Sequence, residues 1–108
     1  MFSSLIVARM DPGHADAVAD IFSTFDATDM PARMGTLRRE LFRYRGLYLH
    51  LQDFETPDGT AAVEAAKTDP RFIGISNGLK PYIEAYSPTW RSPKDAMAER
   101  FYHWGAER

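Results

Sequence analysis

The residues best suited to chemistry lie in the stretch FRYRGLYLHLQDF, where His50 stands among leucines. A two-residue turn at Arg45-Gly46 predicts that residues 36–44 and 47–54 form a β-hairpin. The glycine is expected to supply the positive φ that such a tight turn needs. Counting outward from this turn gives the residue opposite each strand position, and so predicts the neighbours of His50 in the sheet.

Residues that lie directly opposite each other in an antiparallel pair project from the same face of the sheet. The count gives one mainly apolar face, which we expect helices to cover, made of Phe42, Tyr44, Leu47, Leu49 and Leu51. The other face carries Arg39, Leu41, Arg43, Tyr48, His50 and Gln52. This second face mixes cations, hydrogen-bonding groups and aromatic rings, as a pocket for a polar aromatic ligand would.

Purely structural roles are also open for the charged members of this face. A lone histidine in a strand is commonly a buried structural residue or a surface residue. Arg39 and Arg43 could pair with acidic side chains across a dimer interface. The convergence of both arginines with His50 leaves catalysis and structure as two open interpretations of the same residues.

The chain of 108 residues has the length of one domain, and we treat residues 1–108 as a single unit. Its formal net charge is −2 and it has no long basic run, so nucleic acid is not an expected partner. The apolar run near the N-terminus is too short to span a bilayer and lacks the features of a signal peptide. These properties predict a cytoplasmic protein with no membrane partner.

Two kinds of cofactor are not expected from the residue types present. The chain has no cysteine, and its histidines at positions 14, 50 and 103 lack the spacing of a metal site. It also lacks the glycine-rich loops that hold nucleotides. We therefore expect neither a metal nor a nucleotide cofactor.

Periodicity along the chain predicts alternating strands and helices. Asp11-Pro12 is typical of a helix start, and apolar residues at helical spacing follow it. The expected elements are a strand at 2–10, a helix at 12–26, a loop at 28–35, the hairpin, a turn at 56–59, a helix at 60–67, a helical segment within 69–86 and a last strand at 96–105. This β-α-β-β-α-β order predicts a ferredoxin-like α+β fold, with a four-stranded antiparallel sheet and helices on one face.

The second face of such a sheet also needs a cover. Two copies that pair through these faces would supply it, in a homodimer that closes into an α+β barrel. The modest core expected of so short a chain favours such pairing.

Six segments, RMDP at 9–12, FDATDMP at 25–31, GTLRRELFRYRGLYLHL at 35–51, DPRF at 69–72, YIEAYSPTW at 82–90 and DAMAERFYHW at 95–104, carry a family resemblance. In order and spacing they resemble the tetracenomycin-cyclase-type family of aromatic polyketide cyclases. These are small proteins of bacterial type II polyketide pathways, which make antibiotics or spore pigments. The similarity runs nearly end to end.

The resemblance implies a dimeric ferredoxin-like fold with an interior cavity on a face of the sheet. It also implies cofactor-free intramolecular aldol cyclisation of a poly-β-ketone, with loss of water. Carried over by motif, the family's functional arginine, histidine and aspartate fall on Arg39, His50 and Asp26. The histidine that precedes this aspartate in the family is replaced here by Phe25, expected either in the helix core or against a ligand.

For this chemistry Arg39 and Arg43 would stabilise enolate charge. His50, with a reference pKa of about 6.5, would act as base and then as acid. Asp26 would orient an imidazole or a substrate hydroxyl, or it would cap the break after the first helix. Candidate walls for a flat ligand, which are also ordinary core material, are Phe25, Tyr48, Gln52, Trp90, Phe101 and Trp104.

Two other functions fit the same scaffold. A cofactor-free monooxygenase of anthrone-like aromatics would share the dimeric fold and the cavity, and would differ in consuming oxygen. A non-catalytic subunit that steers a polyketide synthase would change product patterns without acting on an isolated intermediate. A cyclase could itself contact synthase components transiently.

Overall fold

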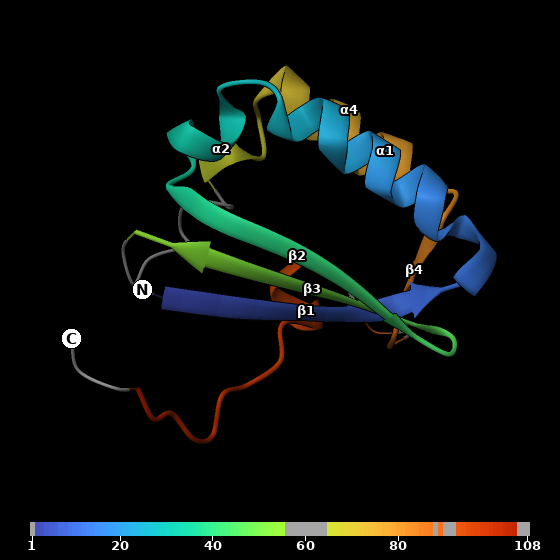
Figure 1. Ribbon diagram of the computed structural model, residues 1–108. Helices are drawn as coiled ribbons and strands as arrows, with labels where there is room; N and C mark the ends of the chain where they lie inside the picture. The colour runs from blue at the N-terminus through green and yellow to red at the C-terminus, as the bar shows by residue number, and fades with distance from the viewer. Residues whose placement is uncertain (1, 56–64, 88, 90–92, 106–108) are drawn as a thin grey trace.

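The computed structural model describes residues 2–55, 65–87, 89 and 93–105. Its sheet is antiparallel throughout, with the strand order β2 (Thr36–Tyr44), β3 (Leu47–Phe54), β1 (Phe2–Met10) and β4 (Ile83–Ala85). One face is covered by the helices α1 (Ala15–Asp26), α2 (Met30–Arg33) and α4 (Pro70–Leu79) (Figure 1). This is the ferredoxin-like α+β arrangement that the sequence predicts.

Two helices begin as the sequence predicts, at an aspartate followed by proline. The Asp11 carboxylate accepts a hydrogen bond of 2.8 Å from the Gly13 N–H, and a 3₁₀ turn at Pro12–His14 leads into α1. The Asp69 carboxylate accepts one of 2.8 Å from the Arg71 N–H at the start of α4. Each carboxylate satisfies an N–H group that a first helical turn leaves unpaired. Both helix starts are therefore set by local sequence.

The β2–β3 hairpin has the register counted from the sequence, with Leu41 opposite His50 and Arg39 opposite Gln52. β1 lies along the other side of β3 and brings Ile6 opposite His50. His50 therefore lies on a strand that is paired on both sides, with Leu41 and Ile6 beside it.

The turn of this hairpin differs from the prediction in one backbone angle. The positive φ falls on Arg45, at 55°, and not on Gly46. A left-handed conformation costs a residue with a side chain on the order of 1 kcal/mol. The Arg45 guanidinium lies 5.5 Å from the centre of the Tyr44 ring, a cation–π contact that offsets part of this cost.

The helices cover the opposite face of the hairpin from the one predicted. Tyr48 and His50 are buried at 4% and 6% exposure, whereas Phe42 is 50% and Tyr44 59% exposed. Alternation along a strand separates two faces without saying which of them the helices will cover. Here the Phe22 ring of α1 packs edge-on against the His50 ring, with centroids 5.2 Å apart. The mixed polar and aromatic face is therefore the interior one.

The fourth strand comes from a segment predicted to be helical. α4 ends at Leu79, and residues Ile83–Ala85 pair with β1, with Ile83 opposite Met10. Pro81 accounts for the helix end, because proline has no N–H with which to continue the helical hydrogen bonds.

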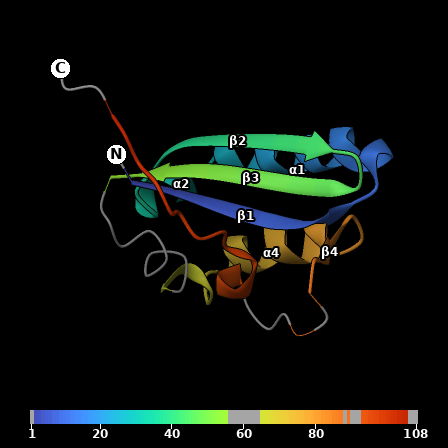
Figure 2. The same cartoon turned by 90° about the horizontal axis from the view of Figure 1, so that it is seen from below.

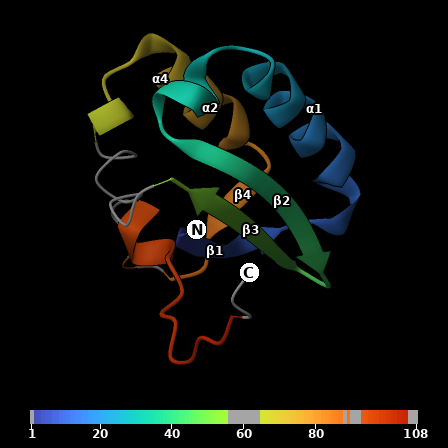
Figure 3. The same ribbon diagram turned by 60° about the vertical axis from the view of Figure 1, so that its left-hand side comes forward.

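The predicted strand at 96–105 does not form. Met97 makes an isolated bridge to Ile6, and the Ala98 N–H donates to the Leu5 carbonyl at 2.7 Å. The segment then extends away from the sheet on the side opposite to the helices (Figures 1 and 3). β4 pairs with Ala8, Arg9 and Met10, so the contacts of Met97 and Ala98 lie on the next part of this edge of β1 and do not extend into a strand.

The connections differ from the prediction at one place. The expected loop at 28–35 contains the short helix α2, because Pro31 is compatible with a first helical turn and Met30 is buried. The turn at 56–59 and most of the helix at 60–67 fall outside the described residues. Among the helices that are described, none is long and apolar enough to cross a membrane.

Candidate active site

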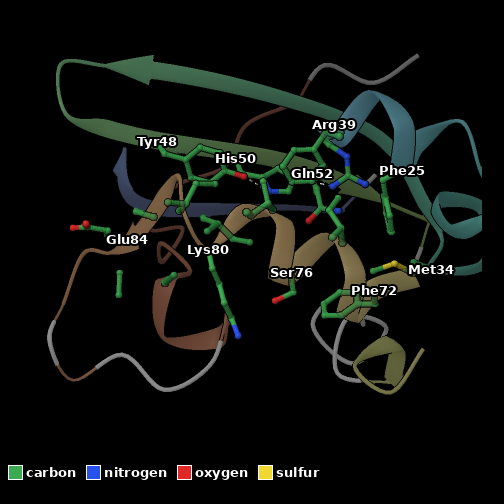
Figure 4. A pocket seen from close by; sticks show the side chains of 18 residues that line it. Phe25, Met34, Arg39, Tyr48, His50, Gln52, Phe72, Ser76, Lys80 and Glu84 are labelled. Carbon is green, nitrogen blue, oxygen red and sulfur yellow. Dashed lines mark hydrogen bonds between the residues drawn. The ribbon is translucent and has the colours of Figure 1, made fainter. Parts of the chain in front are cut away.

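A cavity of about 280 Å³ lies between the sheet and the helices α1 and α4 (Figure 4). β3 contributes Tyr48, His50 and Gln52, which alternate along the strand and face into the cavity. Most of the remaining wall is apolar and includes Phe22, Phe25, Met34, Phe72, Ile75 and Leu79. A small apolar cavity with a few grouped polar side chains is typical of a site for a small organic ligand.

The open side of the cavity lies where α4 ends and β4 begins. Ser76, Lys80 and Glu84 line the cavity there and are exposed to solvent. Figure 4 shows the Lys80 side chain extending away from the sheet, out of the interior. Charged groups thus lie at the mouth, while in the interior Arg39 is a buried cation on the cavity wall.

Arg39 of β2 is held by Asp26, the last residue of α1. The Arg39 Nε donates to both Asp26 carboxylate oxygens, at 3.1 and 3.0 Å, and Nη2 donates to Oδ1 at 3.0 Å. The Arg39 side chain is 8% exposed, with its guanidinium carbon 4.9 Å from the centre of the Phe22 ring. Such paired, two-point contacts fix the guanidinium plane as well as its position.

The same guanidinium also reaches the histidine in the sheet. Arg39 Nη1 lies 2.9 Å from His50 Nε2, and the Tyr48 hydroxyl lies 3.0 Å from His50 Nδ1. A continuous hydrogen-bonded chain therefore runs from Asp26 through Arg39 and His50 to Tyr48 along the cavity wall.

The alternative role of Asp26, as a cap for the break after the first helix, is taken by another residue. The Thr28 hydroxyl donates to the Phe25 carbonyl at 2.7 Å and accepts from the Met30 N–H at 3.2 Å. A carboxylate at the C-terminal end of a helix is unfavourable because that end carries partial negative charge. Arg39 supplies the compensating positive charge.

Burial shifts the pKa of both aromatic groups in this hydrogen-bonded series, His50 and Tyr48. Burial, and secondarily the Arg39 guanidinium, lower the pKa of His50 to about 3. Burial raises the pKa of Tyr48, so its phenol stays protonated. The expectation that His50 titrates near neutrality is therefore wrong: in the folded protein its imidazole is neutral at neutral pH.

The structure brings together most of the predicted site residues. Phe25, Arg39, Tyr48, His50 and Gln52 all line the cavity. Phe25 belongs to the helix core as well, so both of its expected roles are compatible. Asp26 joins the site through its ion pair with Arg39.

Other predicted residues do not line the cavity. Arg43 is exposed near the hairpin turn, and its Nη1 donates to the Pro12 carbonyl at 3.1 Å. Phe101 and Trp104 are 97% and 75% exposed on the segment that leaves the sheet. Their aromatic character predicts ligand walls, but within the described part of the chain both side chains remain largely exposed. Trp90 lies outside the described residues.

The sequence analysis missed the wall that α4 contributes. Phe72, Ile75, Ser76, Leu79 and Lys80 all line the cavity. Their spacing of three and four residues places them on one side of a helix, a signal present in the sequence. A helix prediction that continues past Pro81 hides this signal, because the structure ends the helix at Leu79.

The cavity offers hydrogen-bonding groups and apolar walls, without a cluster of metal ligands. Among the residues that the structure describes, no three acidic or histidine side chains gather in a way that could hold a metal ion. The polar groups of the cavity suit the carbonyl and hydroxyl oxygens of an organic molecule.

Comparison with known proteins assigns the family. The chain matches the family described as "Polyketide synthesis cyclase" over residues 2–105. It belongs to the polyketide synthesis cyclase family. This confirms the resemblance found in the sequence and supports an enzyme.

Individual relatives agree with this family in sequence and structure. Tetracenomycin F2 cyclase of Streptomyces glaucescens is 36% identical over 97% of this chain and 95% of its own length. Its solved structure superposes with a TM-score of 0.93 over 99% of this chain and 100% of that chain. Polyketide synthase CurG of Streptomyces cyaneus is 35% identical over 96% of this chain and 97% of its own length.

A cofactor-independent oxygenase shares the fold at greater distance. SnoaB of Streptomyces nogalater superposes with a TM-score of 0.56 over 84% of this chain and 96% of that chain, at 16% identity. At this identity the likeness shows the fold alone. The scaffold therefore does not separate cyclisation from oxygenation, while the family assignment favours cyclisation.

We expect His50 to make the folded state less stable as the pH falls below about 6.5, the ordinary pKa of histidine. Because the pKa of His50 is lowered to about 3 in the folded protein, the unfolded chain binds a proton in this range that the folded state excludes. The free energy of unfolding should fall by up to about 1.4 kcal/mol per pH unit from this group. Denaturant titrations at a series of pH values measure the slope.

The variant His50→Asn should flatten this pH dependence, since it removes the titrating group. The matched control His103→Asn removes an exposed histidine and should keep the wild-type slope. Equal slopes in the wild type and His50→Asn would show that the imidazole is not held neutral by the fold.

Proposed function

We propose that this protein is an aromatic polyketide cyclase that closes a ring in a poly-β-ketone, or in a partly cyclised intermediate, by intramolecular aldol addition and loss of water. The family and the relatedness to tetracenomycin F2 cyclase support the reaction class. The observation that carries the proposal to this chain is the Asp26–Arg39–His50 network on the wall of an apolar cavity.

The first task of such an enzyme is to fold a flexible substrate. Holding one reacting carbon against one carbonyl can lower a barrier by roughly 7–11 kcal/mol in favourable cases. The walls made by Phe22, Phe25, Phe72 and Ile75 are suited to enclose the carbon skeleton. The grouped polar side chains of β2 and β3 are suited to receive the oxygens.

The second task is to stabilise the charge that develops on oxygen. A carbon between two carbonyls gives up its proton readily because the resulting enolate is delocalised. Arg39 presents a fixed positive group beside the cavity, and Asp26 and His50 hold it in place. Preorganised donors of this kind stabilise an enolate without having to reorganise during the reaction.

We assign His50 the role of a neutral positioning group, and not that of a base and acid titrating near neutrality. Its lowered pKa and its contact with Arg39 support this revision. The acidity of the substrate itself then supplies the proton that moves during ring closure. In this mechanism the enzyme acts largely as a template with directed hydrogen bonds.

Ring closure followed by loss of water involves no net oxidation, so it requires no redox cofactor. We propose a cytoplasmic enzyme, whose contacts with synthase components are transient. We expect turnover of a poly-β-ketone intermediate to proceed at the same rate with and without oxygen, with water as the only co-product. An oxygen electrode and mass spectrometry of the product measure this; stoichiometric oxygen uptake would instead establish the monooxygenase.

We expect Arg39→Gln to lower kcat/KM for ring closure by about 10²–10³-fold, because it removes the fixed charge beside the enolate. The assay uses an isolated intermediate without the synthase, so turnover by the wild type also excludes a purely steering subunit. The matched control is Arg43→Gln, on the same strand and the same side but outside the cavity, which should keep wild-type activity. Equal activity of both variants would contradict the role of Arg39.

We also propose that the protein is a homodimer formed through the uncovered face of the sheet, which Figure 2 shows in front of the helices. The strand pairings place the charged Arg9 and Glu40 on this face, together with seven large apolar side chains: Leu5, Val7, Phe42, Tyr44, Leu47, Leu49 and Leu51. A contiguous apolar face of this size is unusual on a monomer and is typical of an interface. A second copy would present the same face and cover it.

We expect the wild type to sediment as a dimer at micromolar concentration and Phe42→Glu to shift it toward monomer. The glutamate would place a charge within the proposed apolar interface. The control Ile73→Glu introduces the same charge on an exposed position of α4 and should leave the dimer intact. A monomeric wild type in analytical ultracentrifugation would exclude this assembly.

A further inference from the structure

We propose that Tyr48 is a further catalytic residue, whose phenol O–H donates a hydrogen bond to the substrate carbonyl that is attacked during ring closure. The inference rests on the proposed cyclase function. It gives Tyr48 a role as a hydrogen-bond donor in addition to its place in the cavity wall. It follows from which group donates and which accepts in each hydrogen bond of the series that links Asp26, Arg39, His50 and Tyr48.

The direction is set at the arginine. A guanidinium has only donors and is charged at every physiological pH, so the contact between Arg39 Nη1 and His50 Nε2 has one possible direction. Arg39 donates across the 2.9 Å, and Nε2 must be the unprotonated, accepting nitrogen of the ring. Asp26 at the far end accepts from Arg39 and cannot reverse the chain.

The tautomer of His50 then fixes which group donates in the next hydrogen bond. A neutral imidazole carries one proton, and with Nε2 accepting that proton is on Nδ1. The Nδ1–H therefore donates across the 3.0 Å to the Tyr48 oxygen. Burial keeps the imidazole of His50 neutral, since it lowers the pKa of the ring.

The Tyr48 hydroxyl is left with its own proton to donate. Within the described residues its hydrogen-bond partner is His50, to which it is the acceptor. Tyr48 is 4% exposed and lines the cavity, so bulk water is a poor partner for this O–H. A buried donor without an acceptor is destabilising, and a ligand oxygen in the cavity would supply the missing acceptor.

The chemistry of ring closure places such an oxygen there. As the enol carbon attacks, a carbon–carbon bond forms and the electron pair of the attacked carbonyl moves onto its oxygen. The Tyr48 O–H stabilises that oxygen, and His50 and Arg39 polarise the O–H from behind. The proton released by the enol passes to the new alkoxide, so the step is balanced. The phenol remains protonated, consistent with burial raising the pKa of Tyr48.

The test compares Tyr48→Phe, which removes one O–H and keeps the ring, with the wild type on an isolated poly-β-ketone intermediate. We expect kcat and kcat/KM to fall together by about 10–100-fold, because the bond strengthens in the transition state. The control Tyr82→Phe removes a phenol that does not line this cavity and should keep wild-type kcat. Circular dichroism and thermal unfolding verify that both variants fold.

A wild-type enzyme that turns over while Tyr48→Phe keeps its kcat would overturn this inference and leave the proposed function standing. A wild type without activity on the intermediate would instead count against the function. Nitrogen NMR of wild-type protein labelled at histidine tests the chain without any variant. We expect the His50 proton on Nδ1 at neutral pH; a proton on Nε2, or on both nitrogens, would overturn the proposal.

A binding measurement separates this role from a structural one. The probes are 1,8-dihydroxyanthraquinone and 1,8-dihydroxyanthracene, which share a flat ring system and differ in the carbonyl oxygens. We expect Tyr48→Phe to weaken binding of the quinone by about five- to tenfold, the worth of one hydrogen bond, and to leave binding of the anthracene unchanged. Equal effects on both probes would show that Tyr48 acts only by packing.

Discussion

The site depends on the contacts of one guanidinium. Arg39 projects from β2, is held at two points by Asp26 at the end of α1, and donates to His50 in the middle of β3. It joins a helix end to the centre of the sheet while being 8% exposed itself. Because a buried charge is stable only with its partners in place, the position of α1 and the electrostatics of the cavity depend on the same contacts.

The consequence is a cavity with directed hydrogen bonds and little net charge on its wall. The charges of Arg39 and Asp26 cancel, and burial keeps His50 neutral and Tyr48 protonated. Such a wall can orient carbonyl oxygens without offering an ionised base to a reactive intermediate. The aromatic and aliphatic remainder of the wall limits how a flexible chain can fold, which is what a cyclase must control.

The same strands divide two tasks between alternate residues. On β2 and β3, the residues that line the cavity face the helices, and the apolar residues between them belong to the uncovered face. Phe42 and Arg39 are three residues apart and lie on opposite faces. A one-residue slip of register would exchange the two sets of residues. The hairpin turn fixes the register and so determines both the cavity wall and the uncovered apolar face.

Local sequence determined the hairpin register, the two helix starts at Asp11 and Asp69, and the convergence of Arg39 with His50. These features depend on turn geometry and capping, which act over a few residues. The tertiary structure alone decided which face of the sheet the helices cover. It also decided that Ile83–Ala85, and not the C-terminal segment, forms the fourth strand, and that the pKa of His50 lies far below neutrality. Burial and the pairing of a segment with a strand edge depend on residues distant in the chain, and no local pattern contains them.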